Sequence, residues 1–197
     1  PAQASRPFSV DRAGFILSEG AGMLVLATES TARRLGLTPQ AELVGWALNS
    51  DGYHVALPDG ARIARCLATV FERTGVRPEQ VDYYNAHGTS TTVNDRVETQ
   101  AIKEVLGAHA ARLPVSSIKG ALGHSLGAAS AIEAAACVRA LLNQLIPPTI
   151  HLRPDPELDL DYVPDTARPA TLETVLSASF GFGGTNNALI FRRWSDG

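Results

Sequence analysis

Two histidines follow predicted strands in this sequence, at positions where they could act on a bound ligand. The first is His87, in residues 81–95, which read VDYYNAHGTSTTVND. A short apolar and aromatic run ends at His87-Gly88, and hydroxyl side chains follow before Asn94 and Asp95 open a helix. An imidazole at a strand end can exchange a proton with a ligand at the sheet edge, or donate a hydrogen bond to it. The stretch therefore predicts proton or hydrogen-bond chemistry.

The second histidine, His124, lies in a stretch built in the same way. Residues 116–127 read SSIKGALGHSLG: a strand end, a glycine-interrupted loop that carries Lys119, and then the histidine at the start of a helix. A single histidine on such a turn would most often be structural. Two histidines in equivalent positions indicate one shared site.

The composition is that of an ordinary globular chain. Of its 197 residues, 45% are hydrophobic and 19% are charged, which is enough for one sizeable core. The formal net charge is −3 without a basic block, so we expect no nucleic-acid groove and no membrane-surface patch. The most apolar stretch, residues 122–146, is interrupted by Glu133, Arg139 and Asn143, and no signal peptide is recognisable. We therefore predict a soluble, cytoplasmic protein.

The two cysteines, Cys66 and Cys137, each fall within an apolar helical pattern. Neither has the spacing of a metal ligand. We expect buried thiols in a reducing cytosol and no metal site.

The start of the chain has no leading element that could cap a fold. The chain begins at Pro1 without a methionine, which suggests a piece of something longer. The apolar runs 15–17 and 23–26, joined by a glycine-rich turn, predict two short buried strands. Residues 29–35 predict a short helix that Gly36 ends.

From residue 41 onward, strands and helices alternate. Apolar runs predict strands at 41–49, 81–86, 114–118, 174–179 and 187–192. Helical spacing of apolar residues predicts helices at 61–74, 94–106 and 125–144. The last of these is apolar almost all round, so it must be covered on both sides. It is predicted to lie in a middle layer between sheets.

Residues 123–127, GHSLG, match the G-x-S-x-G nucleophile elbow of serine hydrolases. An elbow needs a strand that runs directly into its first glycine, whereas the predicted strand ends near Ile118. The only histidine after Ser125 is His151, and Glu133 is the only acidic residue between them. This arrangement does not supply the expected triad, and a serine esterase remains only as an alternative.

Three stretches together resemble the β-ketoacyl-[acyl carrier protein] synthases of the type II or polyketide branch. They are NAHGTST at 85–91, KGALGHSLGAA at 119–129 and SFGFGGTN at 179–186. Other short matches occur in the same order: RPF at 6–8, GAG at 20–22, Tyr53-His54 and PPT at 147–149. The ordered set covers nearly all of the chain.

The resemblance implies an α/β fold of the thiolase-like kind, in which two duplicated halves stack as αβαβα layers. Residues 41–197 would be its C-terminal half, with a mixed sheet and a buried apolar helix. Residues 1–40 would be the end of the N-terminal half.

The resemblance also implies a reaction, the decarboxylative Claisen condensation of a malonyl-carrier-protein extender with an acyl thioester. His87 and His124 would donate hydrogen bonds to the enolate oxygen, each well-aimed donor contributing roughly 3 kcal/mol. His124, at a predicted helix N-terminus, should be kept neutral by the positive end of the helix dipole. Lys119 would orient the site or simply pair with Glu133, a lone carboxylate on an apolar helix that needs a partner. Phe182 would be a gating residue whose backbone N–H joins the acyl oxyanion hole.

Further family positions are matched by residues around these four. Asp95 and Glu98 would belong with Glu133 to a supporting network, although helix capping alone would explain the first two. The positions implied to bind substrate are Thr89, Thr91, Tyr53, His54, Phe180 and Gly183. No cofactor of the chain's own is implied, only the phosphopantetheine arm of an acyl carrier protein, which the two threonines would contact.

The nucleophilic cysteine of this family lies in its N-terminal half, and no matching motif occurs here. We therefore expect the chain to be inactive alone and to need an N-terminal ketosynthase half, within a homodimer or heterodimer of ketosynthase-fold subunits. One alternative is a non-catalytic partner subunit of the chain-length-factor kind. Retention of both histidines argues against it.

Overall fold

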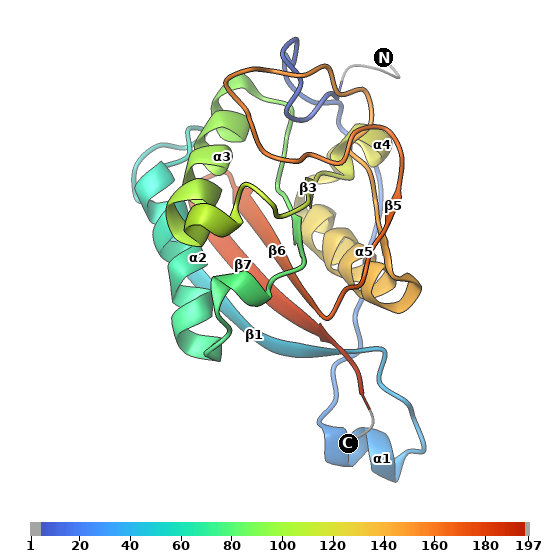
Figure 1. The fold of residues 1–197 in the computed structure, drawn as a ribbon. Coiled ribbons are helices and arrows are strands. Elements are labelled where there is room, and N and C mark those ends of the chain that lie inside the picture. Colours follow the sequence, from blue (N-terminus) through green and yellow to red (C-terminus); the bar gives the residue numbers. More distant parts are fainter. Residues whose placement is uncertain (1–4, 196–197) are drawn as a thin grey trace.

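The structure is a computed structural model that describes residues 5–195, and a five-stranded sheet lies at its centre (Figure 1). The strand order is β1-β7-β6-β2-β3. The strands are β1 Ala41–Ser50, β2 Tyr83–Asn85, β3 Val115–Ser116, β6 Thr174–Gly181 and β7 Thr185–Arg193. β2 pairs in parallel with β3 and β6, whereas β7 is antiparallel to β1 and β6. The predicted mixed sheet is therefore confirmed.

Helices cover both faces of this sheet, as Figure 1 shows. The helices are α1 Glu29–Arg34, α2 Gly60–Thr74, α3 Thr92–Leu106, α4 Lys119–Leu122 and α5 Ala129–Asn143. Of these, α1 lies apart from the sheet, at the bottom of Figure 1. α2 packs against β1, β7 and α3, while α5 packs against β6 and β7. A small second sheet joins β4 Leu145–Ile146 to β5 Arg168–Pro169. The described residues thus form three layers of the thiolase-like arrangement.

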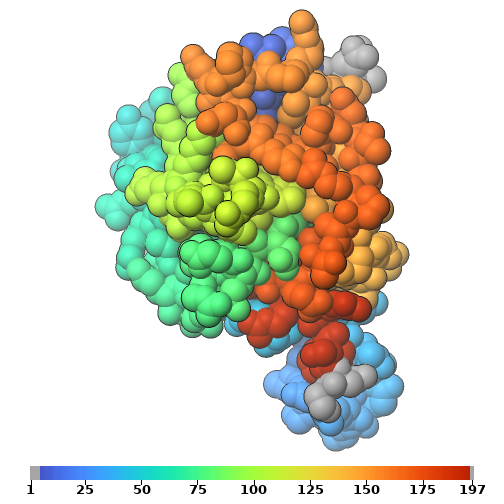
Figure 2. All heavy atoms as spheres, in the orientation of Figure 1, coloured from blue at the N-terminus to red at the C-terminus, as the bar shows by residue number. Residues whose placement is uncertain are grey.

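The segment between β4 and β5 lies alongside α3 on the molecular surface, where it is orange in Figure 2. Acidic residues at alternate positions of this segment each pair with a different cation. The pairs are Asp155 with Arg12, Glu157 with Arg96, Asp159 with Lys103 and Asp161 with Arg168. Of these four pairs only the Arg12 pair is largely buried, so removing one of its two partners is expected to destabilise the fold more than in the other pairs.

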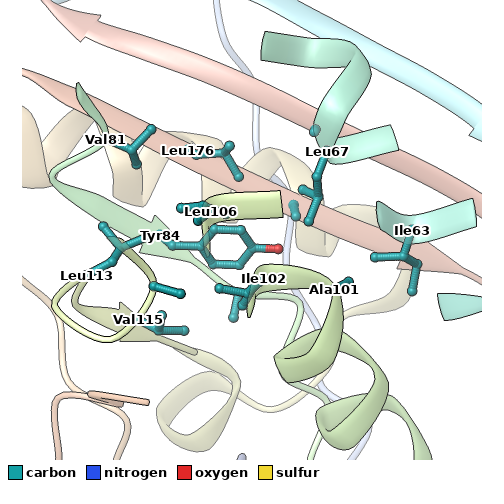
Figure 3. Close-up of a cluster of buried hydrophobic side chains, with 14 of the residues drawn as sticks. Ile63, Leu67, Val81, Tyr84, Ala101, Ile102, Leu106, Leu113, Val115 and Leu176 are labelled. Carbon is teal, nitrogen blue, oxygen red and sulfur yellow. The ribbon is translucent and has the colours of Figure 1, made fainter. Parts of the chain in front are cut away.

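Alternation along the strands divides the interior into two apolar clusters. Tyr84 on β2 belongs to the cluster beneath α2 and α3, whereas its neighbour Tyr83 belongs to the cluster beneath α5. In Figure 3 the Tyr84 ring lies among Leu106, Ile102 and Val115. Successive side chains of a strand point to opposite faces, so a strand covered on both faces is apolar at consecutive positions.

Capping residues set the start of the helices beside the site. Asp59 accepts a hydrogen bond from Ala61 N–H at the start of α2, and Gly75 ends that helix with φ +68°. Thr91 accepts one from Asn94 N–H at the start of α3. The Thr91 side chain therefore fixes the point at which the His87 turn ends and α3 begins.

The prediction of two buried strands at 15–17 and 23–26 is wrong. Within those runs, Leu17 forms a single bridge with His124, and most of the apolar side chains are exposed. Met23 is 89% exposed and Val25 is 91% exposed, so nothing in the described chain covers them. An apolar run becomes a strand only where another strand is available to pair with it. Residues 18–26 instead run as an extended segment, in which Gly22 approaches Ala131 and Ile132 of α5.

The prediction that the apolar helix is covered on both sides is met on one side only. Ala134, Cys137 and Leu141 of α5 are buried in the cluster against the sheet. The opposite face, which includes Ala131 and Ile132, stays half-buried because the described residues contain no second sheet above it. The helix also begins later than predicted: α4 and a 3₁₀ turn at Leu126–Ala128 precede Ala129.

Among residues 5–195, one helical stretch, Leu126–Asn143, is long and apolar enough by composition to cross a membrane. In this fold it packs against β6 and β7 and carries Glu133, which is 1% exposed and paired with Lys119. It is therefore a core helix here.

Residues 5–17 contribute to the same core as the rest of the chain. The Phe8 ring is 1% exposed and stacks on Tyr162, with 4.2 Å between ring centroids. The division of the chain near residue 40 stays a prediction.

Two leucine substitutions on helices test this packing. Leu67→Ala on α2 removes a side chain that is 0% exposed, so it should lower the free energy of unfolding by about 2–5 kcal/mol. Leu142→Ala on α5, where the side chain is 44% exposed, should cost about 1 kcal/mol or less. Urea unfolding followed by circular dichroism measures both, and equal costs would contradict the assignment of the core.

Candidate active site

His87 and His124 lie side by side at the carboxyl ends of neighbouring strands. His87 follows β2, and His124 follows β3 and α4. Their ring centroids are 5.5 Å apart with an angle of 82° between the ring planes. Both rings line a cavity of about 620 Å³. Residues 16–18 hold His124 in place, because its backbone N–H donates to Ile16 O (2.8 Å) and its carbonyl accepts from Ser18 N–H (3.1 Å).

Hydrogen bonds to the rings define which nitrogen of each imidazole carries the proton. Leu126 N–H donates to Nδ1 of His124 over 3.1 Å, so that nitrogen is an acceptor. The ammonium of Lys119 faces Nδ1 of His87 at 3.5 Å, which makes that nitrogen an acceptor as well. A neutral imidazole with an unprotonated Nδ1 carries its proton on Nε2. Each ring therefore has its Nε2–H left as a donor.

The surroundings keep both imidazoles neutral at physiological pH. Burial, together with the smaller effect of the positive charge on Lys119, lowers the pKa of His124 to about 4. Burial also lowers the pKa of His87 well below its usual value, helped by Lys119 and by His124. The helix dipole, which was the cause expected from the sequence, does not account for this neutrality, because α5 begins five residues after His124. Desolvation and a buried cation produce the same result.

Lys119 joins the elements that carry the two histidines. Its side chain is 2% exposed, and its ammonium donates to the His87 carbonyl oxygen over 2.6 Å. It also forms an ion pair with Glu133 of α5. Glu133 in turn accepts a hydrogen bond from Ser179 Oγ on β6 (3.0 Å). Orientation and ion pairing, the two roles considered for Lys119 from the sequence, thus coincide in one contact network.

Glu98 and Asp95 hold the opposite side of the His87 turn. Glu98 accepts hydrogen bonds from the backbone N–H groups of His87 and Gly88, each over 2.8 Å. Asp95 accepts from Phe8 N–H (2.8 Å) and Ser90 N–H (3.1 Å). Burial raises the pKa of Glu98 to about 7 and that of Asp95 to about 6, although these hydrogen bonds favour the ionised forms.

Phe182 lies at the tip of the β6–β7 hairpin and borders the cavity, with 67% of its side chain exposed. Gly183 and Gly184 follow it at φ +80° and +77°, a backbone region that favours glycine. A Cβ on Gly184 would also lie 2.6 Å from Cβ of Asp51. The hairpin tip therefore depends on both glycines.

Asp51 ties the loop between β1 and α2 to this hairpin. Its backbone N–H donates to Gly184 O (2.7 Å), and its carboxylate accepts from Asn186 Nδ2 (2.5 Å) and Asp59 N–H (2.9 Å). Gly183 N–H donates to Val55 O over 2.8 Å. The two loops that border the cavity are thus held to one another.

The structure brings together most, not all, of the side chains predicted to bind substrate. Thr89, Thr91, His54 and Phe180 line the cavity, and Phe180 also contacts the His87 ring at 5.4 Å between centroids. Tyr53 is exposed and Gly183 lies on the hairpin tip, and neither is among the lining residues.

Several residues at the cavity were not singled out from the sequence. Phe15 lies against His124 with 4.8 Å between ring centroids, and Asn94 and Ser179 line the cavity. Apolar residues of the 51–59 loop and of the 3₁₀ turn complete the wall, namely Val55, Ala56, Leu57, Pro58 and Leu126. The signals in the sequence for this wall were the position of residues 55–58 next to Tyr53-His54 and the position of Leu126 within the 119–129 stretch.

The GHSLG stretch does not have the form of a nucleophile elbow. Gly123 follows the helix α4, not a strand, and Ser125 has an unstrained φ of −85°. Within residues 5–195, no cluster of three or more His, Cys, Asp or Glu side chains is arranged to hold a metal ion.

Known proteins share both the sequence and the fold of this chain. The family model described as "Beta-ketoacyl synthase, C-terminal domain" matches residues 40–153. The chain belongs to the β-ketoacyl synthase family. The 3-oxoacyl-[acyl-carrier-protein] synthase 2 of Synechocystis sp. is 47% identical to this ketosynthase chain, over 98% of the chain and 47% of the relative. The tetracenomycin polyketide synthase ketoacyl synthase alpha subunit of Streptomyces glaucescens is 45% identical, over 98% and 46%.

Solved ketosynthase structures agree with the thiolase-like fold. One contains a type II polyketide acyl-carrier protein in complex with its ketosynthase bound to the hexaketide; it matches with a TM-score of 0.94 and 37% identity. The ishigamide ketosynthase/chain length factor matches with a TM-score of 0.94 and 40% identity. These matches cover 98% of this chain and 48% and 47% of the solved chains. The chain therefore spans about half the length of the relatives it matches.

Removing one partner of the buried ion pair should be far more harmful than removing both. Lys119→Met leaves the Glu133 carboxylate buried and unpaired, so it should lower the free energy of unfolding by about 3–5 kcal/mol. The double variant Lys119→Met/Glu133→Leu should recover about half of that loss or more, because no uncompensated charge remains. Denaturant unfolding of the three proteins measures both effects. A double variant less stable than Lys119→Met would contradict this account.

Glu98 should make stability depend on pH with a defined sign. Its pKa is raised from about 4.5 in the unfolded chain to about 7 in the fold, so the folded state binds more protons between these values. Its contribution is therefore full below about pH 4.5 and is lost as the pH rises through 7. Glu98→Gln should abolish this part of the pH dependence, which amounts to at most about 3 kcal/mol at 1.36 kcal/mol per pKa unit.

The measurement is the unfolding free energy of wild type and Glu98→Gln at pH 5 and pH 7.5. His87, His124 and Asp95 titrate in both proteins, so their contributions cancel when the two pH differences are compared. An identical pH dependence in the two proteins would show that Glu98 titrates normally.

Proposed function

We propose that this chain supplies the enolate-stabilising half of a β-ketoacyl synthase, which condenses a malonyl-carrier-protein extender with an acyl thioester. The observation that supports it most is the pair of neutral imidazoles. Both rings border one cavity, and each has its Nδ1 occupied and Nε2–H left to donate. Two such donors suit an oxygen on which negative charge develops.

In the first step, a malonyl thioester loses carbon dioxide, and the electron pair of the broken bond moves into the thioester as an enolate. His87 and His124 donate their Nε2–H groups to the enolate oxygen. The ammonium of Lys119 lies behind His87 and favours negative charge in front of the rings. Because both imidazoles are already neutral donors, no proton has to be moved before the charge develops.

In the second step, the enolate carbon attacks the carbonyl of an acyl group carried by a cysteine. A carbon–carbon bond forms, the cysteine thiolate leaves, and the 3-ketoacyl thioester stays on the carrier protein. The backbone N–H of Phe182 serves the acyl oxyanion in this step. Cys66 and Cys137 are unsuitable as the nucleophile, because both thiols are buried and burial raises their pKa values, that of Cys66 to about 11.

The nucleophilic cysteine is supplied by an N-terminal ketosynthase half, of which residues 1–40 are the end. Support comes from the half-buried outer face of α5 and the exposed apolar side chains beside it, Met23, Val25 and Leu26. A surface of this kind is typical of one that another domain covers. The complete protein forms a homodimer or heterodimer of ketosynthase-fold subunits. The ishigamide structure, whose name pairs a ketosynthase with a chain length factor, supports a paired arrangement of this kind.

The carrier protein delivers its acyl group on a phosphopantetheine arm through the mouth of the cavity. Thr89 and Thr91 line that cavity with their hydroxyls 2.9 Å apart, and they contact the arm. The matched polyketide ketosynthase is solved in complex with its acyl-carrier protein, which supports a partner of this kind.

Substitution of the two histidines tests the proposed reaction in a protein that combines this chain with a cysteine-bearing N-terminal half. His87→Ala and His124→Ala should each slow carbon dioxide release from a malonyl-carrier protein by about 10²–10³-fold, the effect of losing one oxyanion donor. His151→Ala is the control, because His151 does not line the cavity. A histidine variant that releases carbon dioxide within about threefold of wild type would refute the assignment.

The isolated chain should form no 3-ketoacyl thioester, because it lacks the nucleophile. Formation of that product from acyl- and malonyl-carrier protein, followed by mass spectrometry, would overturn the proposed division between halves. If the combined protein releases no carbon dioxide, the chain is instead a partner subunit of the chain-length-factor kind. Labelling of Ser125 by a fluorophosphonate probe would favour the esterase.

A further inference from the structure

The backbone of the His87-Gly88 turn has polar groups that must be satisfied away from the sheet. Pairing between β2 and β3 reaches as far as Ala86 N–H, which donates to Ser116 O over 2.9 Å. Beyond that bond the strands no longer pair, yet His87 and Gly88 are still buried. Buried N–H and C=O groups need partners, so side chains must replace the missing strand.

Three side chains hold all four polar groups of this turn. Glu98 accepts from both N–H groups, and the Lys119 ammonium donates to the His87 carbonyl oxygen over 2.6 Å. The fourth group, the Gly88 carbonyl oxygen, accepts a hydrogen bond from Ser117 Oγ over 2.8 Å. The resemblance to known ketosynthases accounts for the first two side chains. It assigns nothing to Ser117.

Ser117 connects the turn of one histidine to the chain that leads to the other. Its hydroxyl oxygen also accepts a hydrogen bond from Lys119 N–H (3.3 Å), and its own N–H donates to Thr149 Oγ1 (3.0 Å). Ser117 is 0% exposed and is not among the residues that line the cavity. It can therefore affect a ligand only through the groups it positions.

The backbone at Gly88 and the side chain of Ser117 are packed closely against each other. A Cβ built on Gly88 would lie 2.5 Å from Ser117 Cβ and 2.9 Å from its Oγ. The backbone at Gly88 thus rests directly on the Ser117 side chain. Any change in the length of that side chain or of its hydrogen bond must move the two turns relative to each other.

We propose that Ser117 is a positioning residue that fixes the separation and mutual angle of the His87 and His124 rings by tying the Gly88 carbonyl to the Lys119 backbone. The role rests on the proposed function, because the donors must converge on one oxygen. A misplacement of about 1 Å in the reacting geometry can cost on the order of 100-fold in rate, whereas substrate binding depends on many other contacts. Loss of Ser117 should therefore lower kcat and leave KM nearly unchanged.

The test compares Ser117→Ala with Ser116→Ala in the complete ketosynthase. Ser116 is also 0% exposed, and its hydroxyl makes a hydrogen bond of 2.8 Å with Tyr83 OH, away from the histidine turns. Both variants lose one buried hydroxyl, so both should lose similar stability. Ser117→Ala should lower kcat for carbon dioxide release by about 10–100-fold with KM within twofold, whereas Ser116→Ala should keep kcat within threefold.

A second variant decides the question if Ser117→Ala does not fold. Ser117→Cys keeps the shape of the side chain but has a longer and weaker donor. It should fold and still lose kcat at least about tenfold. The imidazole resonances of His87 and His124 should shift in the Ser117 variants and stay in place in Ser116→Ala, which reports position independently of activity.

Three results would overturn the proposal. They are a folded Ser117 variant with kcat within threefold of wild type, an equal loss of kcat in Ser116→Ala, or imidazole resonances unchanged by Ser117 substitution. A wild-type protein that releases no carbon dioxide would refute the proposed function instead. In that case shifted resonances would still support the positioning role of Ser117.

Discussion

The buried ammonium of Lys119 is the interaction on which the rest of the site depends. A cation removed from water is tolerated only if charged and polar groups replace its hydration. Here Glu133 of α5 and the His87 carbonyl oxygen do so, and Glu133 is held in turn by Ser179 on β6. The polar contacts of this one ammonium therefore hold α5, β6 and the turn after β2 in place around the cavity.

The same cation determines the electrical character of the cavity. Its charge adds to burial in lowering the pKa values of both histidines, so neither ring becomes a competing cation. The carboxylate of Glu98 is directed at backbone N–H groups behind His87, which keeps negative charge away from the front of the rings. Neutral imidazole donors face the cavity and the Lys119 ammonium lies behind them. This arrangement stabilises negative charge that develops on a bound ligand. The decarboxylation in the proposed function would develop such a charge.

Local features of the fold were readable from the sequence, and features that depend on distant partners were not. Apolar spacing predicted α2 and α3 closely, because a helix satisfies its backbone within itself. It failed at residues 15–26, because a strand also needs a partner, and the described chain offers Leu17 a single bridge. It also could not show that β1 pairs with β7, some 140 residues later in the chain.

Similar limits applied to the site. The lone carboxylate of Glu133 on an apolar helix predicted its pairing with Lys119, because a buried charge demands a partner. The neutrality of His124 was predicted, but from a helix dipole, whereas burial and Lys119 are the cause. Asp51 and Ser117 carry no sequence signal of their own, since an aspartate in a loop and a serine after a strand are commonplace. Their roles arise from contacts with Gly184 and Gly88, which only the fold brings near.

Several groups of the described chain place the two imidazoles relative to each other. The β2–β3 pairing, Glu98, Lys119 and Ser117 set the His87 turn, while residues 16–18 and Leu126 set His124. These contacts set the geometry between the rings within residues 5–195. A nucleophile from another domain has to reach only the cavity that these rings already border. In such an arrangement the two imidazole donors can stay fixed while the acyl chain moves. This arrangement is compatible with the proposed function, in which the donors and the cysteine belong to different halves of one fold.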